Sequence, residues 1–317
     1  MHVLLDPTIL FFALGLFAGL VRSNFEIPAQ VSRFLCLYLL MALGLKGGFA
    51  LADSGLTLRV AGDLGLAVLM ALSVPLAGYA LLRRWLPPLD AAAVAATYGS
   101  VSAVTFVTTV QVLDLNGVAY GGHMAAAMAL MESPAILLAV FLANRLRAGS
   151  GSSPARFSHV LHESLTDGAQ LLLLGSMVVG YVSGPAGEAV MAPFSIDLFK
   201  GMLAFFLLDM GLQTARQLPA LRGRSAWLLG YALLAPLVHA TTALALGSLA
   251  GMSTGNTVLL MALAASASYI AAPAVLREAI PEANPSLYVG LSLGITFPFN
   301  ILVGVPLYLE VASRVAG

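Results

Sequence analysis

The stretch Ala264–Pro285, AASASYIAAPAVLREAIPEANP, decides the expected fold. It begins with small apolar residues, as the middle of a membrane helix does, and is then interrupted. Ser266 and Ser268 offer little bulk, and Pro273 lacks a backbone donor. A helix that breaks at mid-membrane needs such residues, because its freed backbone groups must face a cavity or an ion rather than lipid. We therefore predict a discontinuous membrane helix here.

An earlier stretch, Thr97–Asp114, TYGSVSAVTFVTTVQVLD, has the same character. Ser100 and Ser102 precede Ser266 and Ser268 at a constant spacing, and Gly44 precedes Gly211 at nearly the same one. This pattern predicts two diverged halves, residues 1–145 and 164–317, joined by a linker at 146–163. Paired broken helices in two such halves are typical of the substrate site of a transporter. Close packing of small residues without any ligand is the alternative.

The composition is that of a membrane protein with many spans. Of 317 residues, 59% are hydrophobic and 9% are charged, whereas soluble domains carry about 25% charge. The net charge of zero gives no indication of a nucleic-acid partner, and the single cysteine, Cys36, excludes an internal disulfide. Apolar runs predict ten helical spans at residues 7–22, 29–47, 60–83, 91–114, 121–145, 164–183, 196–214, 225–250, 255–280 and 286–312.

Five spans in each half is an odd number, so the second half must enter the membrane from the opposite side. The expected fold is therefore an all-α membrane protein of two inverted five-helix repeats, in which helices four and nine are discontinuous and cross. Most of the 15 Lys and Arg residues fall on one side of this arrangement. The positive-inside rule makes that side cytoplasmic. We expect a bacterial inner-membrane protein with both termini outside, a short external loop at 183–193 and a cytoplasmic linker.

The two breaks predict an anion site. A half-helix N-terminus presents free N–H groups and a partial positive charge, so two of them can hold an anion without Lys or Arg. Five hydroxyls are candidates to complete the hydrogen bonds: Ser100, Ser102, Thr105, Ser266 and Ser268. Each could instead bond back to its own helix.

A carboxylate in the fifth span, Glu132, predicts a cation site. An ionisable group at membrane depth indicates function by default, and Glu132 precedes Ser133 and Pro134, where the proline frees a carbonyl. The corresponding region of the second half offers Asn300 as a neutral oxygen donor. Together these oxygens suit Na⁺ or a proton. A structural hydrogen bond to a neighbouring helix is the alternative for Glu132. No nucleophile motif, phosphate loop or metal cluster is visible, so neither an enzyme nor a bound cofactor is expected.

Five motifs carry a family resemblance: LMALGLKGG (40–48), SVSAVT (100–105), MESPAI (131–136), LAPLVHA (234–240) and ASASYIAAPAVLREAIPEANPSLYVG (265–290). In this order they resemble the sodium-dependent bicarbonate permease family known from cyanobacteria. The resemblance implies two inverted repeats, a core domain sliding against a gate domain, and a homotrimer in the lipid membrane. It also implies bicarbonate and Na⁺ bound where the discontinuous helices cross, and a PII-like protein as regulator.

The resemblance carries over to individual residues. The hydroxyl-rich first crossing of the family is matched by Ser100, Ser102 and Thr105, the second by Ser266 and Ser268, and the acidic residue of the fifth span by Glu132. Where the family pattern has an Asp after its serine run, this chain has Tyr269.

The sequence therefore predicts a secondary transporter that imports a small anion, bicarbonate by resemblance, together with Na⁺ by alternating access. Transport of another small anion, or coupling to H⁺ through Glu132, is the alternative within this class. A membrane sensor that binds a partner through its basic linker and does not transport is the alternative from another class.

Overall fold

Every regular element in the part of the chain that the structure describes is a helix. The structure is a computed structural model that describes residues 5–55, 57–147, 162 and 166–316. The first half contains α1 (Pro7–Leu20), α2 (Ala29–Ser54), α3 (Leu58–Leu82), α4 (Pro88–Gly99), α5 (Ala103–Leu115) and α6 (Met124–Arg147). The second contains α8 (Gly168–Ala192), α9 (Phe199–Gln217), α10 (Ala226–Leu249), α11 (Thr254–Ala265), α12 (Ala271–Ala279), α13 (Pro285–Leu291), α14 (Phe297–Phe299) and α15 (Val305–Ala316).

The helices are those of a membrane protein with many spans. Within the described residues, seven helical stretches are long and apolar enough to cross a membrane, and α1 and α11 are shorter apolar helices. The expectation of an all-α membrane protein is confirmed, and each of the ten predicted ranges contains a helix. Breaks fall inside two of those ranges, between α4 and α5 and between α11 and α12, as the serine-rich stretches predict.

The prediction of a loop at residues 183–193 is wrong. α8 continues to Ala192, and a π-helical turn at Pro193–Asp197 leads into α9, so that 168–221 is one helical run. The only departure within α8 is Gly184, whose φ of 56° places a kink directly before Pro185. Glycine adopts this left-handed conformation without steric cost, so the helix bends there instead of ending. Of the predicted linker at 146–163, residues 148–161 and 163 lie outside the described residues.

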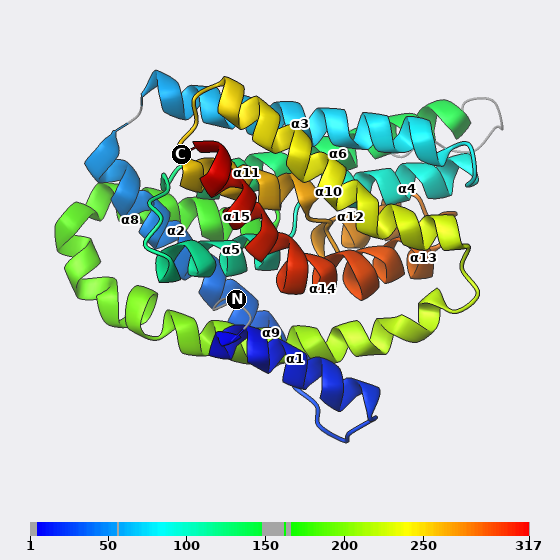
Figure 1. The fold of residues 1–317 in the computed structure, drawn as a ribbon, viewed down its shortest axis with the longest axis horizontal. Helices are drawn as coiled ribbons and strands as arrows, with labels where there is room; N and C mark the ends of the chain where they lie inside the picture. The colour runs from blue at the N-terminus through cyan, green and yellow to red at the C-terminus, as the bar shows by residue number, and fades with distance from the viewer. Residues whose placement is uncertain (1–4, 56, 148–161, 163–165, 317) are drawn as a thin grey trace.

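Four helices, α1, α2, α8 and α9, form a layer that we call the frame. α2 packs along α8, and α1 packs along α9. Glycines allow both contacts: a Cβ at Gly44 would lie 2.4 Å from the carbonyl oxygen of Leu173, and a Cβ at Gly15 would lie 2.0 Å from that of Leu208. Close approach through small residues is the usual way in which membrane helices associate. In Figure 1, α1 and α9 follow the lower edge of the molecule.

The remaining helices, α3–α6 and α10–α15, form a second body that we call the core. α4 packs between α3 and α6, and α11 packs against α10, α15 and α5. α3 and α10 lie along the upper edge of Figure 1, on the side away from α1 and α9. The broken helices are thus enclosed, and α4, α5 and α11 are buried almost along their whole length.

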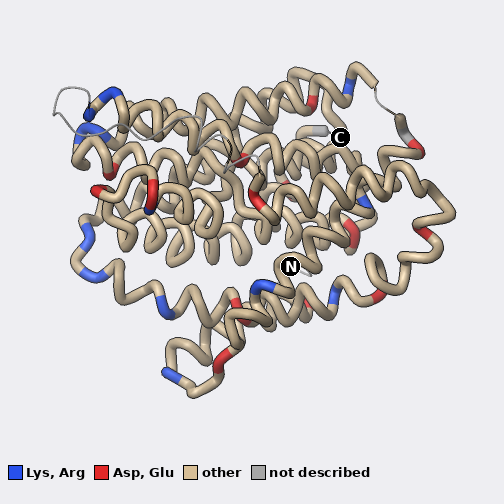
Figure 2. Tube along the Cα trace, turned by 180° about the vertical axis from the view of Figure 1, so that it is seen from behind, with Lys and Arg blue, Asp and Glu red and all other residues tan. Residues whose placement is uncertain are grey.

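Basic residues gather at one end of the helices. Figure 2 shows most of the Lys and Arg at the left end of the view, where α6 ends. The last turns of α6, α9 and α12 each contain Arg there. The clustering agrees with the charge bias from which the sequence predicts a cytoplasmic side.

Candidate functional site

The first helix break spans Ser100–Ser102. Ser100 is extended, with φ −86° and ψ 167°, so α4 stops at Gly99. Ser102 then caps α5, because its Oγ accepts a hydrogen bond from the Thr105 amide at 3.2 Å. Serine is among the best residues at this position, since its short side chain satisfies an N–H group that the helix leaves free.

The second break spans Ser266–Ile270 and repeats this design. Ser266 is extended, with φ −75° and ψ 165°, and α11 stops at Ala265. The Ser268 Oγ accepts a hydrogen bond from the Ala272 amide at 3.1 Å, in the first turn of α12. Both second half-helices therefore begin in the interior of the protein, each with a serine at its N-terminal end.

The two breaks bind each other. The Ser102 amide donates to the Ser266 Oγ at 2.9 Å, and the Ser268 amide donates to the Thr97 carbonyl at 2.7 Å. These bonds pair backbone groups that neither helix could satisfy alone, which a buried break in a membrane protein requires. The sequence-based prediction that the broken segments meet is confirmed by these contacts.

A cavity of about 190 Å³ lies at the crossing, and we call it the serine cavity. Ser102 and Ser268 line it together with Glu132 from α6. The frame supplies the facing wall, with Cys36 and Leu40 from α2 and Gln170 and Leu173 from α8 among the lining residues. The site thus lies between frame and core.

Two kinds of charge meet in the serine cavity. The N-terminal ends of α5 and α12 contribute partial positive charge and free amides at Ala103 and Ala271, both of which line it. Glu132 and Asp167 contribute carboxylates, whereas none of the described lining residues is a Lys or Arg. The arrangement can therefore hold an anion on backbone amides and a cation on carboxylate oxygens within one small space.

The structure places the predicted residues in different surroundings. Ser102, Ser268 and Glu132 come together in the serine cavity. Ser100 and Thr105 are fully buried beside the break and do not line the serine cavity. Neither hydroxyl has a hydrogen-bond partner among the described residues. Ser266 does not line the serine cavity either. Its hydroxyl accepts a hydrogen bond from the Ser102 amide and donates one to the Leu263 carbonyl.

Asn300 holds the scaffold and does not line the cavity. Its Nδ2 donates to the Ala265 carbonyl at 2.8 Å, which satisfies an acceptor at the C-terminal end of α11. Its Oδ1 accepts from the Tyr308 hydroxyl at 2.8 Å. A completely buried amide with these partners fixes the position of the second break.

Tyr269 lies between the core and the frame. Its ring packs against Phe297 with 5.1 Å between ring centroids, and its hydroxyl lies 3.6 Å from the Met210 sulfur of α9. Tyr269 also lines the serine cavity. An aromatic ring thus fills space at the position where the family resemblance implies an Asp.

Sequence reasoning missed the contribution of the frame. Asp167 and Gln170 face Glu132 across the serine cavity, although they are distant in sequence. Asp167 also caps α8, because its Oδ1 accepts from the Ala169 and Gln170 amides at 3.0 and 3.1 Å. A polar Gln170 at the start of an apolar span is the signal that could have indicated this wall.

A second cavity, of about 460 Å³, lies further along the same interface. Lys46 of α2 and Asp114 of α5 line it and form an ion pair of 2.9 Å, so we call it the Lys46 cavity. Residues of α2 separate the two cavities by about one helical turn, since Leu40 lines the first and Leu43 the second. Openings therefore lie on both sides of one contact between frame and core.

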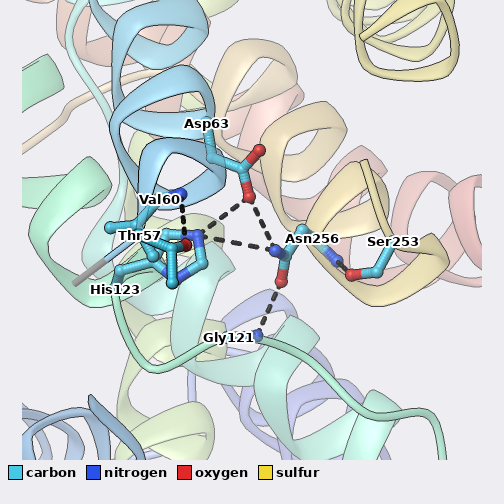
Figure 3. Close-up of polar contacts among 7 residues, drawn as sticks. All are labelled: Thr57, Val60, Asp63, Gly121, His123, Ser253 and Asn256. Carbon is cyan, nitrogen blue, oxygen red and sulfur yellow. Dashed lines mark hydrogen bonds and ion pairs between the residues drawn. The ribbon is translucent and has the colours of Figure 1, made fainter. Parts of the chain in front are cut away.

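A buried polar cluster near the Lys46 cavity ties two core helices to the segment that precedes α6. Asp63 of α3 accepts a hydrogen bond from the Asn256 Nδ2 of α11 at 2.8 Å, and its carboxylate lies 2.9 Å from the His123 Nε2. The Gly121 amide donates to the Asn256 Oδ1 at 2.6 Å. Figure 3 shows Asn256 between Asp63 and Gly121, so the cluster anchors the segment that precedes α6. His123 was visible in the sequence, but its partners are far away along the chain.

The fold and the site define a helical membrane protein with many spans and a buried polar site between two bodies. Residues 7–313 match the sequence model of the Na⁺-dependent bicarbonate transporter superfamily, and the chain belongs to that family. The resemblance inferred from the sequence motifs is thereby confirmed. A search of curated proteins found no match.

Proposed function

We propose that the protein is a secondary transporter that imports bicarbonate together with Na⁺. The observation that carries this proposal is the serine cavity, where two half-helix N-termini and the Glu132 carboxylate meet between frame and core. Membership of the family supports both the substrate and the coupling ion.

Bicarbonate is held by the crossed breaks. A planar anion with three oxygens accepts hydrogen bonds from the amides at the starts of α5 and α12 and from the Ser102 and Ser268 hydroxyls. Each serine Oγ already accepts one bond from its own helix, at 3.2 Å for Ser102 and 3.1 Å for Ser268. A hydroxyl still has its own proton to donate, so capping the helix and binding the anion are compatible.

Na⁺ is held beside the anion by carboxylate oxygen. Glu132 supplies the charge from the core, while Asp167 and Gln170 supply oxygens from the frame. Opposite charges a few ångströms apart stabilise each other strongly where water is scarce. Binding of either ion therefore favours binding of the other, which is the physical basis of coupled transport.

Alternating access follows from the two cavities along one interface. Movement of the core against the frame opens the serine cavity to one side of the membrane or joins it to the Lys46 cavity on the other.

The proposal includes ten spans in two inverted repeats, with residues 1–145 and 164–317 as the halves. The packing of the frame supports the repeat, because the first helix of each half packs on the second helix of the other half: α1 packs on α9, and α2 packs on α8. The end rich in Arg is cytoplasmic, both termini are outside, and the assembly is a homotrimer.

The test is uptake of labelled inorganic carbon into proteoliposomes, with and without an inward Na⁺ gradient. We expect uptake that requires Na⁺. Uptake that follows a proton gradient without Na⁺ would indicate that Glu132 couples transport to H⁺ instead of Na⁺. Absence of uptake from liposomes that contain folded protein would overturn bicarbonate as the substrate, and other small anions would then be compared in the same assay.

A further inference from the structure

A long apolar groove runs between α3 and α10, on the side of the core away from the frame. Its volume is about 550 Å³, and its described lining extends from Met70 on α3 to Trp85 just beyond the end of that helix, and from Trp227 to Thr242 on α10. The fifteen residue steps from Trp227 to Thr242 along α10 correspond to about 22 Å, which exceeds the roughly 15 Å of hydrocarbon in one membrane leaflet. The groove has room for one extended acyl chain.

The walls of the groove offer almost no polar contacts. The Ser73 and Thr242 hydroxyls donate to carbonyls of their own helices, at 3.4 and 2.8 Å. Leu81, Leu234 and Val238 are exposed large apolar side chains of the lining. A ligand for this groove must be apolar along most of its length.

Two buried polar atoms of the lining have no hydrogen-bond partner among the described residues, the His239 Nδ1 deeper in the groove and the Tyr231 hydroxyl nearer its mouth. The Tyr231 side chain is only 8% exposed, lines the groove, and its hydroxyl has no hydrogen-bond partner among the described residues. A buried hydroxyl without a partner is costly, so its presence indicates an acceptor that is absent from the protein itself. Tyr231 lies one helical turn inside the mouth of the groove, counted from Trp227.

The mouth of the groove is aromatic and basic. Trp85 and Trp227 pack there with 4.7 Å between ring centroids, and tryptophan prefers the depth of lipid headgroups. Arg83 and Arg84 directly precede Trp85, and neither guanidinium group forms an ion pair or hydrogen bond with a described residue. Two free guanidinium groups at this depth complement a phosphate.

We propose that this groove binds one anionic glycerophospholipid. One acyl chain lies between α3 and α10, an ester carbonyl accepts the hydrogen bond of Tyr231, and the phosphate contacts Arg83 and Arg84. The proposal is independent of the transported substrate, because every residue that it uses lies outside both cavities of the frame–core interface.

The chain contains a direct probe of this site, since its two tryptophans are Trp85 and Trp227. The protein is reconstituted into phosphatidylcholine vesicles in which a small fraction of the lipid is phosphatidylglycerol brominated on its acyl chains. Bromine quenches tryptophan fluorescence on contact. We expect quenching several-fold greater than with brominated phosphatidylcholine at the same mole fraction.

Variants separate the headgroup contact from the groove. The double variant Arg83→Ala, Arg84→Ala should abolish the preference for phosphatidylglycerol, and Arg314→Ala should retain it. Gly230→Leu should reduce quenching by both brominated lipids, because a Cβ at Gly230 enters open space in the groove. Gly175→Leu, at an equally open position of α8, is its matched control.

Equal quenching by the two brominated lipids in the native protein would overturn the proposal, because it would indicate ordinary surrounding lipid. Quenching by neither would also overturn it, since a second copy of the chain or a closed groove would then exclude lipid. A preference that persists in the double arginine variant would remove Arg83 and Arg84 from the site and contradict the proposal as stated.

Discussion

At the scale of single residues, the site depends on what each hydroxyl already binds. Ser102 and Ser268 cap helices and line the serine cavity. The Ser266 hydroxyl instead forms both of its hydrogen bonds with backbone groups of the protein. Five equivalent candidates in the sequence thus become two contact residues, two buried neighbours and one structural link. Residue type alone could not separate them, because the distinction lies in which partner stands within hydrogen-bond distance.

We expect Ser102→Ala and Ser268→Ala each to raise the KM for bicarbonate about tenfold, since a hydrogen bond to a charged group contributes about 1.5–3 kcal/mol. The measurement is labelled-carbon uptake against bicarbonate concentration. Each variant also loses a helix cap, which costs about 1 kcal/mol, so folding is checked by thermal unfolding. Thr108→Ala is the control, because this hydroxyl bonds only to its own helix. An unchanged KM in both serine variants would argue against the crossing as the anion site.

We expect Glu132→Gln to abolish the dependence of uptake on Na⁺, because the neutral amide removes the charge that compensates the cation. Glu188→Gln is the matched control, since Glu188 lines the Lys46 cavity instead. The measurement is initial uptake rate against Na⁺ concentration. Retention of full Na⁺ dependence in Glu132→Gln would place the cation elsewhere.

At the scale of elements, polar contacts between distant helices hold the broken segments in place. Asn300 fixes the end of α11, and Asp63 joins α3 to α11 and to the segment before α6. The breaks are visible in the sequence as small residues and prolines. Their supports are not, because each contact joins side chains that lie far apart along the chain.

We expect Asp63→Ala to destabilise the protein by about 1–3 kcal/mol, because it leaves buried donors of the cluster without their acceptor. The measurement is thermal unfolding in detergent. Asp53→Ala, at an exposed position near the end of α2, is the control and should unfold like the native protein. Equal stability of the Asp63 variant would show that water replaces the carboxylate without cost.

A second contact between elements, from the end of α6 to α12 and the loop after it, depends on pH. Arg147 at the end of α6 donates to Glu282 at 3.0 Å and to the Ala279 carbonyl of α12 at 3.1 Å. The hydrogen bond from Arg147 lowers the pKa of Glu282 below its usual value. A lowered pKa in the folded state gives stability above the ordinary pKa of a glutamate, and this stability is lost as the pH falls through the lowered value.

We therefore expect Glu282→Gln to lower the unfolding temperature at pH 7 and to have progressively less effect below about pH 4, the ordinary glutamate range. The effect is small, because the Glu282 side chain is 45% exposed and solvent screens the pair. Unfolding temperatures of both proteins across pH 3–8 provide the measurement. A constant difference at all pH values would mean that the contribution of Glu282 is not electrostatic.

At the scale of the whole molecule, the frame and the core meet along one surface that contains both cavities. The ion pair between Lys46 and Asp114 joins the two bodies at the Lys46 cavity. Cys36 lies in the serine cavity and is the single cysteine of the chain, so its reaction with a thiol reagent reports access to that cavity.

We expect Lys46→Ala to slow the labelling of Cys36 by up to about fivefold, because loss of an ion pair worth up to about 1 kcal/mol favours the state in which the Lys46 cavity opens and the serine cavity closes. Arg314→Ala is the control, since its ion pair with Glu310 lies within one helix. The measurement is the rate of maleimide incorporation. Faster labelling in Lys46→Ala would mean that the ion pair stabilises the state in which the serine cavity is closed, which contradicts this prediction.

The sequence by itself determined the membrane class, the helical content and the two breaks, because hydropathy, proline and runs of small residues act locally on the backbone. It also indicated the family, through motifs spread along nearly the whole chain. Only the tertiary structure decided that Asp167 and Gln170 face Glu132, that Asn300 supports the scaffold, and that residues 183–193 stay helical around Gly184. The reason is physical: the role of a polar side chain in a membrane protein depends on the partner that packing brings to it, and packing joins residues that the sequence keeps apart.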